Sequence, residues 1–194
     1  AQSSADFEKN NMVLGRYFSP DIKNEIEETG LNFSEYIPKN LNVAVLFTDI
    51  VGFTKLSEKM EPNDVLELLS EYQTIMVECI FEFNGTVDKF IGDAVMANFG
   101  TPKSYGNDAQ NAFDCAKKMK SMLHEWNKNR IDNRQKVIEH RIGIHYGECI
   151  VGNVGGEKRV EYTVLGDTVN VASRLCDLSK VFNNDLLILS LIHI

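Results

Sequence analysis

The sequence predicts an α+β fold, a ferredoxin-like α/β sandwich in which helices cover a mixed sheet. Strand-like runs and amphipathic helical segments follow one another in the order β-α-β-β-α-β-β, and a hairpin separates the two long helices. A doubly wound parallel sheet would instead alternate strands with helices throughout. With 194 residues, 43% of them hydrophobic, the chain is long enough to bury a core as one globular domain.

The first expected elements are a buried strand and a long helix. Residues 43–48 form a continuous apolar run, which favours a strand buried on both faces and leaves Asp49 at its carboxyl end. Apolar residues recur at helical spacing over about residues 63–83, and Asn84 and Gly85 then end the helix. We therefore expect an amphipathic helix with one buried face.

A hairpin and a second helix follow. Residues 86–91 and 94–99 are β-rich and are separated only by Gly92 and Asp93, a two-residue turn that places Asp93 at the tip. Residues 108–128 then carry apolar side chains on one helical face. The remaining expected elements are strands over residues 137–147, 148–155 and 161–165, a helix from Asp167 and a short strand from Leu186.

The chain divides into three parts. Residues 1–40 are predicted to form a helical connector to a regulatory region upstream in the same protein. Residues 41–189 form the folded domain. Residues 190–194 are expected to be a tail to which we assign no function, and a sequence artefact is one interpretation of it.

Composition excludes several classes of function. The formal net charge of -8 argues against a nucleic-acid-binding surface, which needs clustered Lys and Arg. The four cysteines stand far apart without a C-x-x-C pair, which argues against a zinc or redox motif and favours a reducing, cytoplasmic environment. Apolar runs stay well short of the roughly 20 residues that a membrane helix needs, so we expect no membrane contact by this fragment.

Two aspartates are the first candidate site residues. Asp49 and Asp93 both follow apolar strands and both have glycine nearby, so each carboxylate is presented where the backbone opens. Two carboxylates meeting at one edge of a sheet suit Mg²⁺, which usually takes one or two protein carboxylates and completes its shell with phosphate oxygens and water. The alternative is ordinary turn chemistry, because Asp is common at hairpin tips.

The segment after Asp49 is a candidate phosphate-binding site. Free backbone N–H groups at the start of a helix favour a pyrophosphate, and a helix is expected near residue 53. A plain strand-to-helix turn would use the same glycine. The candidate residues are Ile50, Val51, Gly52, Phe53 and Thr54.

Further polar residues lie at spacings that place them on defined faces. Asn170 and Arg174 are four residues apart, hence on one helix face, where an amide and a guanidinium suit a sugar oxygen and a phosphate. Arg141 alternates with apolar neighbours and so points to the face opposite them, toward phosphate or solvent. Lys89 lies in the predicted hairpin. For each of these residues a solvent-facing side chain is the alternative.

Four segments taken together resemble one enzyme family. Residues 47–54, 88–100, 141–147 and 162–174, read in order, are similar to the class III adenylate and guanylate cyclases. The resemblance covers about residues 41–189 and implies the fold of that family, incomplete at its C-terminus, because a further phosphate-contacting lysine of the family is not matched before Ile194. The lead-in over residues 16–20 resembles the connector of multidomain bacterial cyclases.

The resemblance implies a role for each matching residue. It assigns two Mg²⁺ or Mn²⁺ ions per active site to Asp49 and Asp93, with Ile50 beside them. It assigns the purine to Lys89 and Thr163, the ribose to Asn170, and the phosphates to Arg141, Arg174 and the segment 50–54, with Asn170 and Arg174 as the catalytic residues.

ATP is the substrate that the resemblance favours. Guanylate cyclases typically have Glu and Cys at the two purine-reading positions, whereas Lys89 and Thr163 resemble the adenine-reading pair of bacterial adenylate cyclases. Lysine donates to adenine N1, and a threonine hydroxyl accepts from the exocyclic amine. The implied reaction is attack of the ribose 3′-oxygen on the α-phosphorus, at sites shared across a head-to-tail homodimer. A guanylate cyclase and a non-catalytic dimerisation or regulatory domain are the alternatives.

Overall fold

The computed structural model describes residues 38–156, 159–182 and 185–190. The helical connector predicted for residues 1–40 therefore lies almost wholly outside the described residues. Its predicted end is wrong, because Lys39 and Asn40 already belong to the first strand. The predicted tail also begins one residue too early, because Ser190 ends the last strand.

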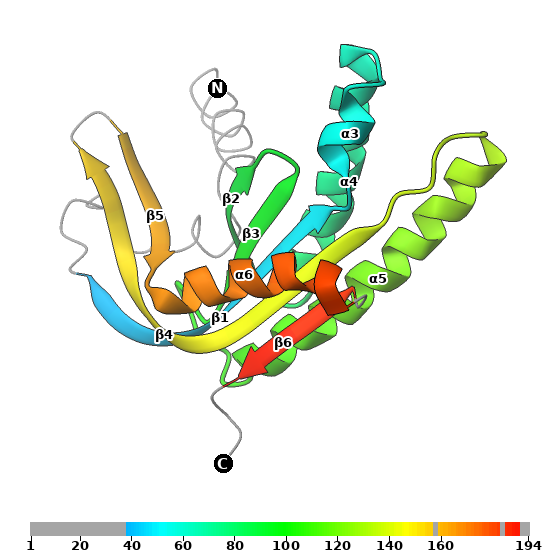
Figure 1. Ribbon diagram of the computed structural model, residues 1–194. Helices are drawn as coiled ribbons and strands as arrows, with labels where there is room; N and C mark the ends of the chain where they lie inside the picture. The colour runs from blue at the N-terminus through cyan, green and yellow to red at the C-terminus, as the bar shows by residue number, and fades with distance from the viewer. Residues whose placement is uncertain (1–37, 157–158, 183–184, 191–194) are drawn as a thin grey trace, which may run out of the picture.

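Ten helices and strands make up the described chain (Figure 1). In order they are β1 (Lys39–Ile50), α3 (Phe53–Ser57), α4 (Pro62–Glu82), β2 (Thr86–Ile91), β3 (Ala94–Phe99), α5 (Asp108–Asp132), β4 (His140–Gly156), β5 (Arg159–Leu165), α6 (Asp167–Phe182) and β6 (Leu186–Ser190). The predicted long helices, the hairpin and the short last strand are confirmed.

The strands form one mixed sheet in the order β2-β3-β1-β4-β5, and β6 pairs with β4 in parallel. All the other pairs are antiparallel. Strands β1, β2, β3 and β4, with α4 and α5 between them in the chain, make the β-α-β-β-α-β unit of a ferredoxin-like fold. The predicted α+β sandwich is confirmed, and α6 covers the other face of the sheet (Figure 1).

Strand β1 is the centre of the core. Its side chains alternate between two apolar clusters, as successive residues of a strand must. Ala44 and Leu46 pack in the cluster with α4 and α5, whereas Val43 and Val45 pack in the cluster with α6. All four are 0% exposed, which confirms the prediction of a strand buried on both faces.

Helix α6 lies directly on the main chain of β4. A Cβ atom at Gly143 would come within 2.3 Å of the Cys176 backbone nitrogen and 2.4 Å of the Ala172 carbonyl oxygen. A Cβ atom at Gly147 would lie 2.7 Å from Thr168 Oγ1. These distances are far below van der Waals contact, so both positions need glycine for the close approach of helix and strand.

The predicted break between two strands at residues 147 and 148 is therefore wrong. Strand β4 runs without interruption from His140 to Gly156 and pairs with β1 along most of its length. Glycine at position 147 serves to admit α6 and does not mark a turn. The other predicted strands correspond to β5 and β6.

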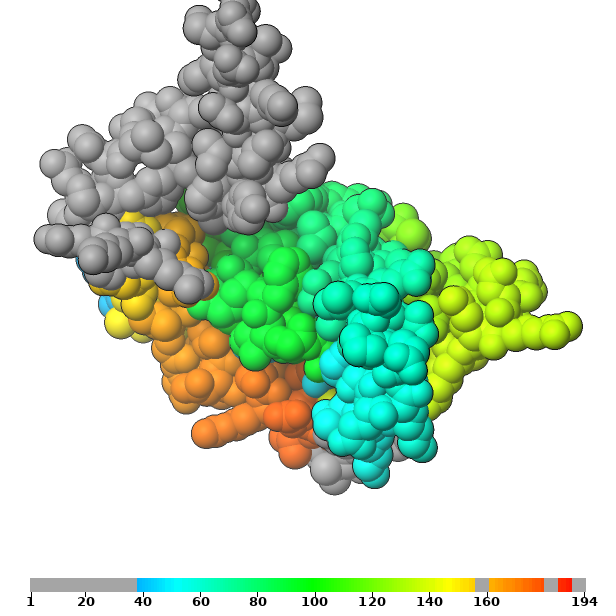
Figure 2. Space-filling view, turned by 90° about the horizontal axis from the view of Figure 1, so that it is seen from above, coloured from blue at the N-terminus to red at the C-terminus, as the bar shows by residue number. Residues whose placement is uncertain are grey.

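The tip of the β2–β3 hairpin is exposed between two other parts of the molecule, whereas most of β3 is buried. In Figure 2 it lies, in green, between α3 and α4 on one side and β5 and α6 on the other. Its tip thereby carries Asp93 toward the end of β1. Among the described residues, no helix combines the length and the apolar composition that crossing a bilayer requires.

Candidate active site

The structure brings Asp49 and Asp93 together. Asp49 is the last residue but one of β1, and Asp93 lies in the turn between β2 and β3, next to β1 because β3 pairs with it. The Ile50 backbone N–H donates a hydrogen bond of 3.0 Å to Asp93 Oδ2. Ile50 itself is 1% exposed, so its side chain is not available to a ligand. The predicted carboxylate pair is present at one edge of the sheet.

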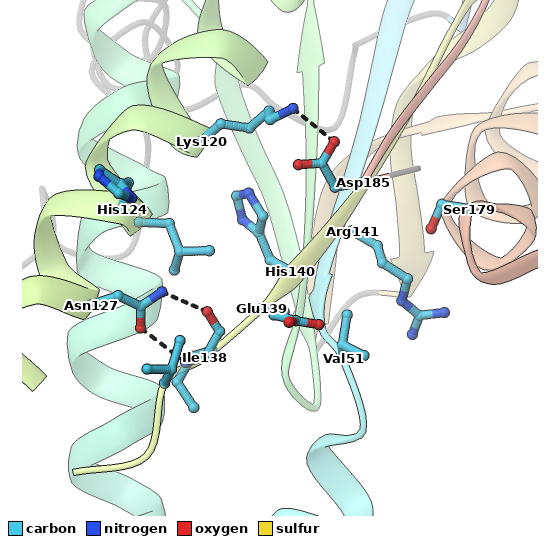
Figure 3. A pocket seen from close by; sticks show the side chains of 12 residues that line it. Val51, Lys120, His124, Asn127, Ile138, Glu139, His140, Arg141, Ser179 and Asp185 are labelled. Atoms are coloured by element: carbon cyan, nitrogen blue, oxygen red, sulfur yellow. Dashed lines mark hydrogen bonds and ion pairs between the residues drawn. The ribbon is translucent and has the colours of Figure 1, made fainter. Parts of the chain in front are cut away.

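Arg141 is buried and contacts Asp49, a partner that the sequence pattern did not predict. Its side chain points to the face opposite Ile142, as predicted, but it is 6% exposed and not solvated. Arg141 pairs in register with Asp49, and its Nη2 donates to Asp49 Oδ2 at 2.9 Å. Figure 3 shows Arg141 and His140 extending to opposite sides of β4. The guanidinium thus contacts a predicted metal ligand, and its contact with phosphate stays a prediction.

The surroundings of Asp49 leave its charge incompletely compensated. Burial raises the pKa of the Asp49 carboxyl to about 6, and the nearby Asp93 raises it too, although Arg141 lowers it. Asp49 Oδ1 is buried without a hydrogen-bond partner, and so are Nε and Nη1 of Arg141. Buried polar atoms without partners are rare in folded proteins, and here they lie around one carboxylate.

These features fit a divalent cation. A carboxylate oxygen that is buried, unpaired and beside a second carboxylate is a suitable ligand for Mg²⁺ or Mn²⁺. No cluster of three or more His, Cys, Asp or Glu side chains with metal-binding geometry occurs among the described residues. Two carboxylates are nevertheless enough for Mg²⁺, which takes its other ligands from water and substrate phosphates.

The segment 50–54 offers fewer backbone donors than predicted. The Ile50 N–H is donated to Asp93, and the Val51 N–H is donated to the Glu139 carbonyl oxygen at 2.8 Å. Gly52 adopts a left-handed conformation with φ of 69°, and α3 begins at Phe53 as expected. The remaining candidates are the N–H groups of Gly52, Phe53 and Thr54, because the first N–H groups of a helix have no partner inside it.

Lys89 and Thr163 meet through Asp88. Strands β2 and β5 lie at opposite ends of the sheet order, yet Thr163 Oγ1 donates to both carboxylate oxygens of Asp88 at 2.8 and 2.9 Å. Lys89 Nζ lies 3.4 Å from Asp88 Oδ1 and 3.0 Å from Glu161 Oε1. The sheet is therefore curled enough to bring its two edges into contact.

Sequence reasoning missed Asp88. The pairing of β2 with β3 shifts register between Val87 and Lys89, so Asp88 is the extra residue of a β-bulge. A bulge re-aims a side chain, and here that of Asp88 is 0% exposed. An acidic residue in an otherwise β-rich run was the available signal. Thr163 is itself 3% exposed, so little of its hydroxyl is open to solvent.

Asn170 and Arg174 lie on the exposed face of α6. Ala172 and Cys176 are buried against β4, and Asn170 and Arg174 share the opposite side of the helix, as the four-residue spacing predicts. Within the part of the chain that the structure describes, neither side chain forms a hydrogen bond or an ion pair. The fold does not add them to the group of Asp49, Asp93 and Arg141.

A cavity of about 820 Å³ lies elsewhere, between α5 and the start of β4 (Figure 3). Lys120 and Asp185 form an ion pair of 2.7 Å at its wall. The His140 side chain extends toward the cavity. His140 is 4% exposed, and both of its ring nitrogens are buried without a hydrogen-bond partner. Burial lowers the pKa of His140 to about 4. The cavity adjoins the predicted site only through Val51 and Arg141, so we base the site on the carboxylates instead.

Comparison with known proteins identifies the family. Residues 35–181 match the model of the adenylate and guanylate cyclase catalytic domain. The chain is 33% identical over 182 residues to adenylate cyclase 1 of Rhizobium meliloti, covering 84% of this chain but only 27% of that protein.

Two solved structures are also similar. The adenylyl cyclase CyaB from P. aeruginosa is 39% identical, with a TM-score of 0.68 over 73% of this chain and 74% of that one. The guanylyl cyclase Cya2 is 36% identical, with a TM-score of 0.69 over 72% of this chain and 71% of that one. The sequence match, the shared fold and the paired carboxylates agree, and the chain belongs to the class III adenylate and guanylate cyclase catalytic domain family.

Proposed function

We propose that this domain is an adenylate cyclase, which converts ATP to 3′,5′-cyclic AMP and pyrophosphate. The observation that carries the proposal is the pair of Asp49 and Asp93, held together by the Ile50 N–H, with a buried carboxylate oxygen that has no partner. The choice of ATP rests on Lys89 and Thr163, and the bacterial relatives named adenylate cyclases support it. The similarity to Cya2 makes a guanylate cyclase the second candidate.

Asp49 and Asp93 would hold two Mg²⁺ or Mn²⁺ ions per site, with the Ile50 main chain beside them. When bound, such ions lower the pKa of the ribose 3′-hydroxyl and neutralise phosphate charge. The N–H groups of Gly52, Phe53 and Thr54 would bind phosphate oxygens at the start of α3. Arg141 would contribute to the same negative charge through Nε and Nη1, which have no hydrogen-bond partner, although Nη1 lies 3.9 Å from Asp177 Oδ1.

The reaction needs no protein nucleophile. The ribose 3′-oxygen forms a bond to the α-phosphorus, the bond from that phosphorus to the bridging oxygen of the β-phosphate breaks, and the hydroxyl proton leaves to solvent. Asn170 would orient the ribose, and the Arg174 guanidinium would stabilise the charge that develops on the α-phosphate in the transition state. Both are exposed and therefore accessible to a nucleotide.

A head-to-tail homodimer would complete the site. Asp49 lies at the end of β1, whereas Asn170 and Arg174 lie on the outer face of α6 without contact to it. A second copy can bring its α6 to the first copy's carboxylates, and the symmetry of such a dimer makes two equivalent sites. The chain spans about a quarter of the length of its Rhizobium relative. A cytoplasmic location and a regulatory domain upstream are further parts of the proposal.

The proposal is tested by product formation. The purified chain with Mn²⁺ should make cAMP from ATP and much less cGMP from GTP. Asp49→Asn and Asp93→Asn should each lower the rate by more than about 100-fold. Each removes a carboxylate that would hold the metal ions, and these ions are needed to neutralise the phosphate charge. Asp64→Asn, at an exposed carboxylate in the first turn of α4, is the matched control and should keep the rate.

Thermal unfolding of each variant checks that the fold is retained. Full activity in either Asp49→Asn or Asp93→Asn would refute the metal assignment. Preferential formation of cGMP would favour the guanylate cyclase, and the absence of both products would favour a non-catalytic domain.

A further inference from the structure

Three hydrogen-bond donors face the buried Asp88 carboxylate. Thr163 Oγ1 donates to it at 2.8 and 2.9 Å, and the Val164 backbone N–H donates to Oδ2 at 3.2 Å. Lys89 Nζ lies 3.4 Å from Oδ1. Burial raises the pKa of the Asp88 carboxyl, and the bonds from Thr163, Lys89 and Val164 partly oppose that rise. An ionised carboxylate only accepts, so the hydroxyl proton of Thr163 is committed to Asp88.

The hydrogen bond to Asp88 decides whether the Thr163 hydroxyl donates to a base or accepts from it. A free threonine hydroxyl rotates and either donates or accepts, so by itself it accommodates the exocyclic amine of adenine or the O6 of guanine equally well. With its proton directed at Asp88, Thr163 presents only lone pairs to an incoming base. At 3% exposure Thr163 has little water with which to exchange that partner.

The donors of Lys89 and the acceptors of Thr163 together match adenine and not guanine. Lys89 has only donors, which suit the acceptor N1 of adenine and oppose the N1–H of guanine. Thr163 with its proton committed has only acceptors, which suit the adenine amine and oppose guanine O6. Both groups lie against the same carboxylate, which fixes the polarity of Thr163 and attracts the ammonium of Lys89.

We propose that Asp88 is the specificity-determining positioning residue, which selects adenine over guanine by fixing Thr163 as an acceptor. The inference rests on the proposed cyclase function and deepens it. Asp88 need not touch the base, because its effect on the choice of purine passes through the hydroxyl of Thr163.

The decisive variant is Asp88→Asn. An amide of the same size offers an N–H that donates to Thr163 Oγ1, which frees the hydroxyl proton for guanine O6. The ratio of kcat/KM for ATP to kcat/KM for GTP should fall by about tenfold or more, because guanine O6 would then meet a hydroxyl that can donate to it. A purely structural role would lower both values together and leave their ratio unchanged.

Glu161→Gln is the matched control. It removes the other carboxylate beside Lys89, at 3.0 Å, but leaves the contact between Asp88 and Thr163 intact. Its ATP to GTP ratio should stay within about threefold of the wild-type ratio. An equal fall in Glu161→Gln and Asp88→Asn would overturn the proposal in favour of Lys89 positioning alone.

The variant Thr163→Val tests whether the effect of Asp88 depends on the Thr163 hydroxyl. In Thr163→Val there is no proton for Asp88 to hold, so adding Asp88→Asn should change the ratio no further. A further fall in the double variant equal to that in the single variant would overturn the proposal.

A measurement on the wild-type chain keeps the test independent of folding. N6-methyl-ATP and 6-methoxypurine riboside triphosphate have the same size and the same acceptor N1, but only the first has an N–H at position 6. The wild type should use the methylamino compound about tenfold better, and equal use would refute the fixed acceptor.

The two proposals fail in different ways. A wild-type chain that forms neither cyclic nucleotide would remove the proposed function itself. A wild type that forms cAMP, with an unchanged ratio in Asp88→Asn, would overturn the role of Asp88 alone.

Discussion

Two polar clusters of this domain differ in how completely the chain satisfies them. The carboxylate cluster (Asp49, Asp93 and Arg141) leaves one buried oxygen and two buried nitrogens without hydrogen-bond partners. The base-reading cluster (Asp88, Lys89 and Thr163, with the Val164 N–H) satisfies its buried carboxylate with three kinds of donor. The first cluster has two carboxylates and one guanidinium, so its excess of negative charge suits the proposed cations. The second is organised before any ligand arrives.

The largest effect should come from separating the two halves of the proposed site. Asp93→Asn chains and Arg174→Ala chains should each lose more than about 100-fold in activity, since one loses a metal ligand and the other the transition-state cation. Refolding the two variants together should form heterodimers with one intact site and recover about a quarter of the wild-type rate.

The measurement is cAMP formation before and after mixing, and a mixture of Asp93→Asn with Asp49→Asn is the control. Both variants of the control damage the same half, so it should recover nothing. Recovery in the control, or none in the test mixture, would contradict the shared site.

The next effect tests whether Arg141 holds the carboxylate cluster together in the absence of a ligand. Arg141→Gln leaves Asp49 without its charged partner, which should lower the free energy of unfolding by about 2 to 3 kcal/mol. The value lies below that of a fully buried pair because the Asp49 side chain is 20% exposed. Urea denaturation without divalent cations measures it, and millimolar Mn²⁺ should restore part of the loss.

An exposed ion pair supplies the comparison. Lys128→Gln breaks the pair with Glu125 and should leave the free energy of unfolding almost unchanged, because the Lys128 and Glu125 side chains are 55% and 60% exposed. Equal losses in the two variants would mean that Arg141 contributes no more than a surface charge.

The effect that is smallest near neutral pH concerns His140, which precedes Arg141 on β4. Its pKa in the folded chain is about 4, below the ordinary value of 6.5, because burial disfavours the charged ring. Between these two pH values only the unfolded chain binds the proton, so His140 should destabilise the fold as pH falls from 6.5 toward 4.

The change should be about 1 kcal/mol per pH unit. The stability difference between wild type and His140→Gln, followed by urea denaturation across this range, isolates it from other titrating groups. A difference that does not vary with pH would show that His140 is already charged or well solvated.

Local patterns were sufficient to predict most elements. The apolar run at 43–48, the helical spacing over 63–83 and the Gly92-Asp93 turn each describe neighbours in the chain, and the structure confirms all three. The break predicted after Gly147 failed because that glycine accommodates Thr168 of α6, a contact between segments some twenty residues apart.

The site was predictable only in part for the same reason. Asp49 and Asp93 could be paired because both follow strands that meet at one edge. The contact between Asp88 and Thr163 needs a bulge and a curled sheet, and these are properties of the whole fold. The pairing of Arg141 with Asp49 depends on the register of β4 against β1, which no local pattern contains.

The glycine beneath α6 has a consequence for movement. Because Gly143 lets the helix backbone touch the strand backbone, no side chain separates α6 from β4 at this point, and this contact limits how far α6 can slide or tilt. The positions of Asn170 and Arg174 relative to the sheet are therefore fixed by the contact between α6 and β4. In the proposed homodimer, tightening around a nucleotide would therefore come from one subunit rocking against the other, and a regulatory region would act on the angle between the subunits.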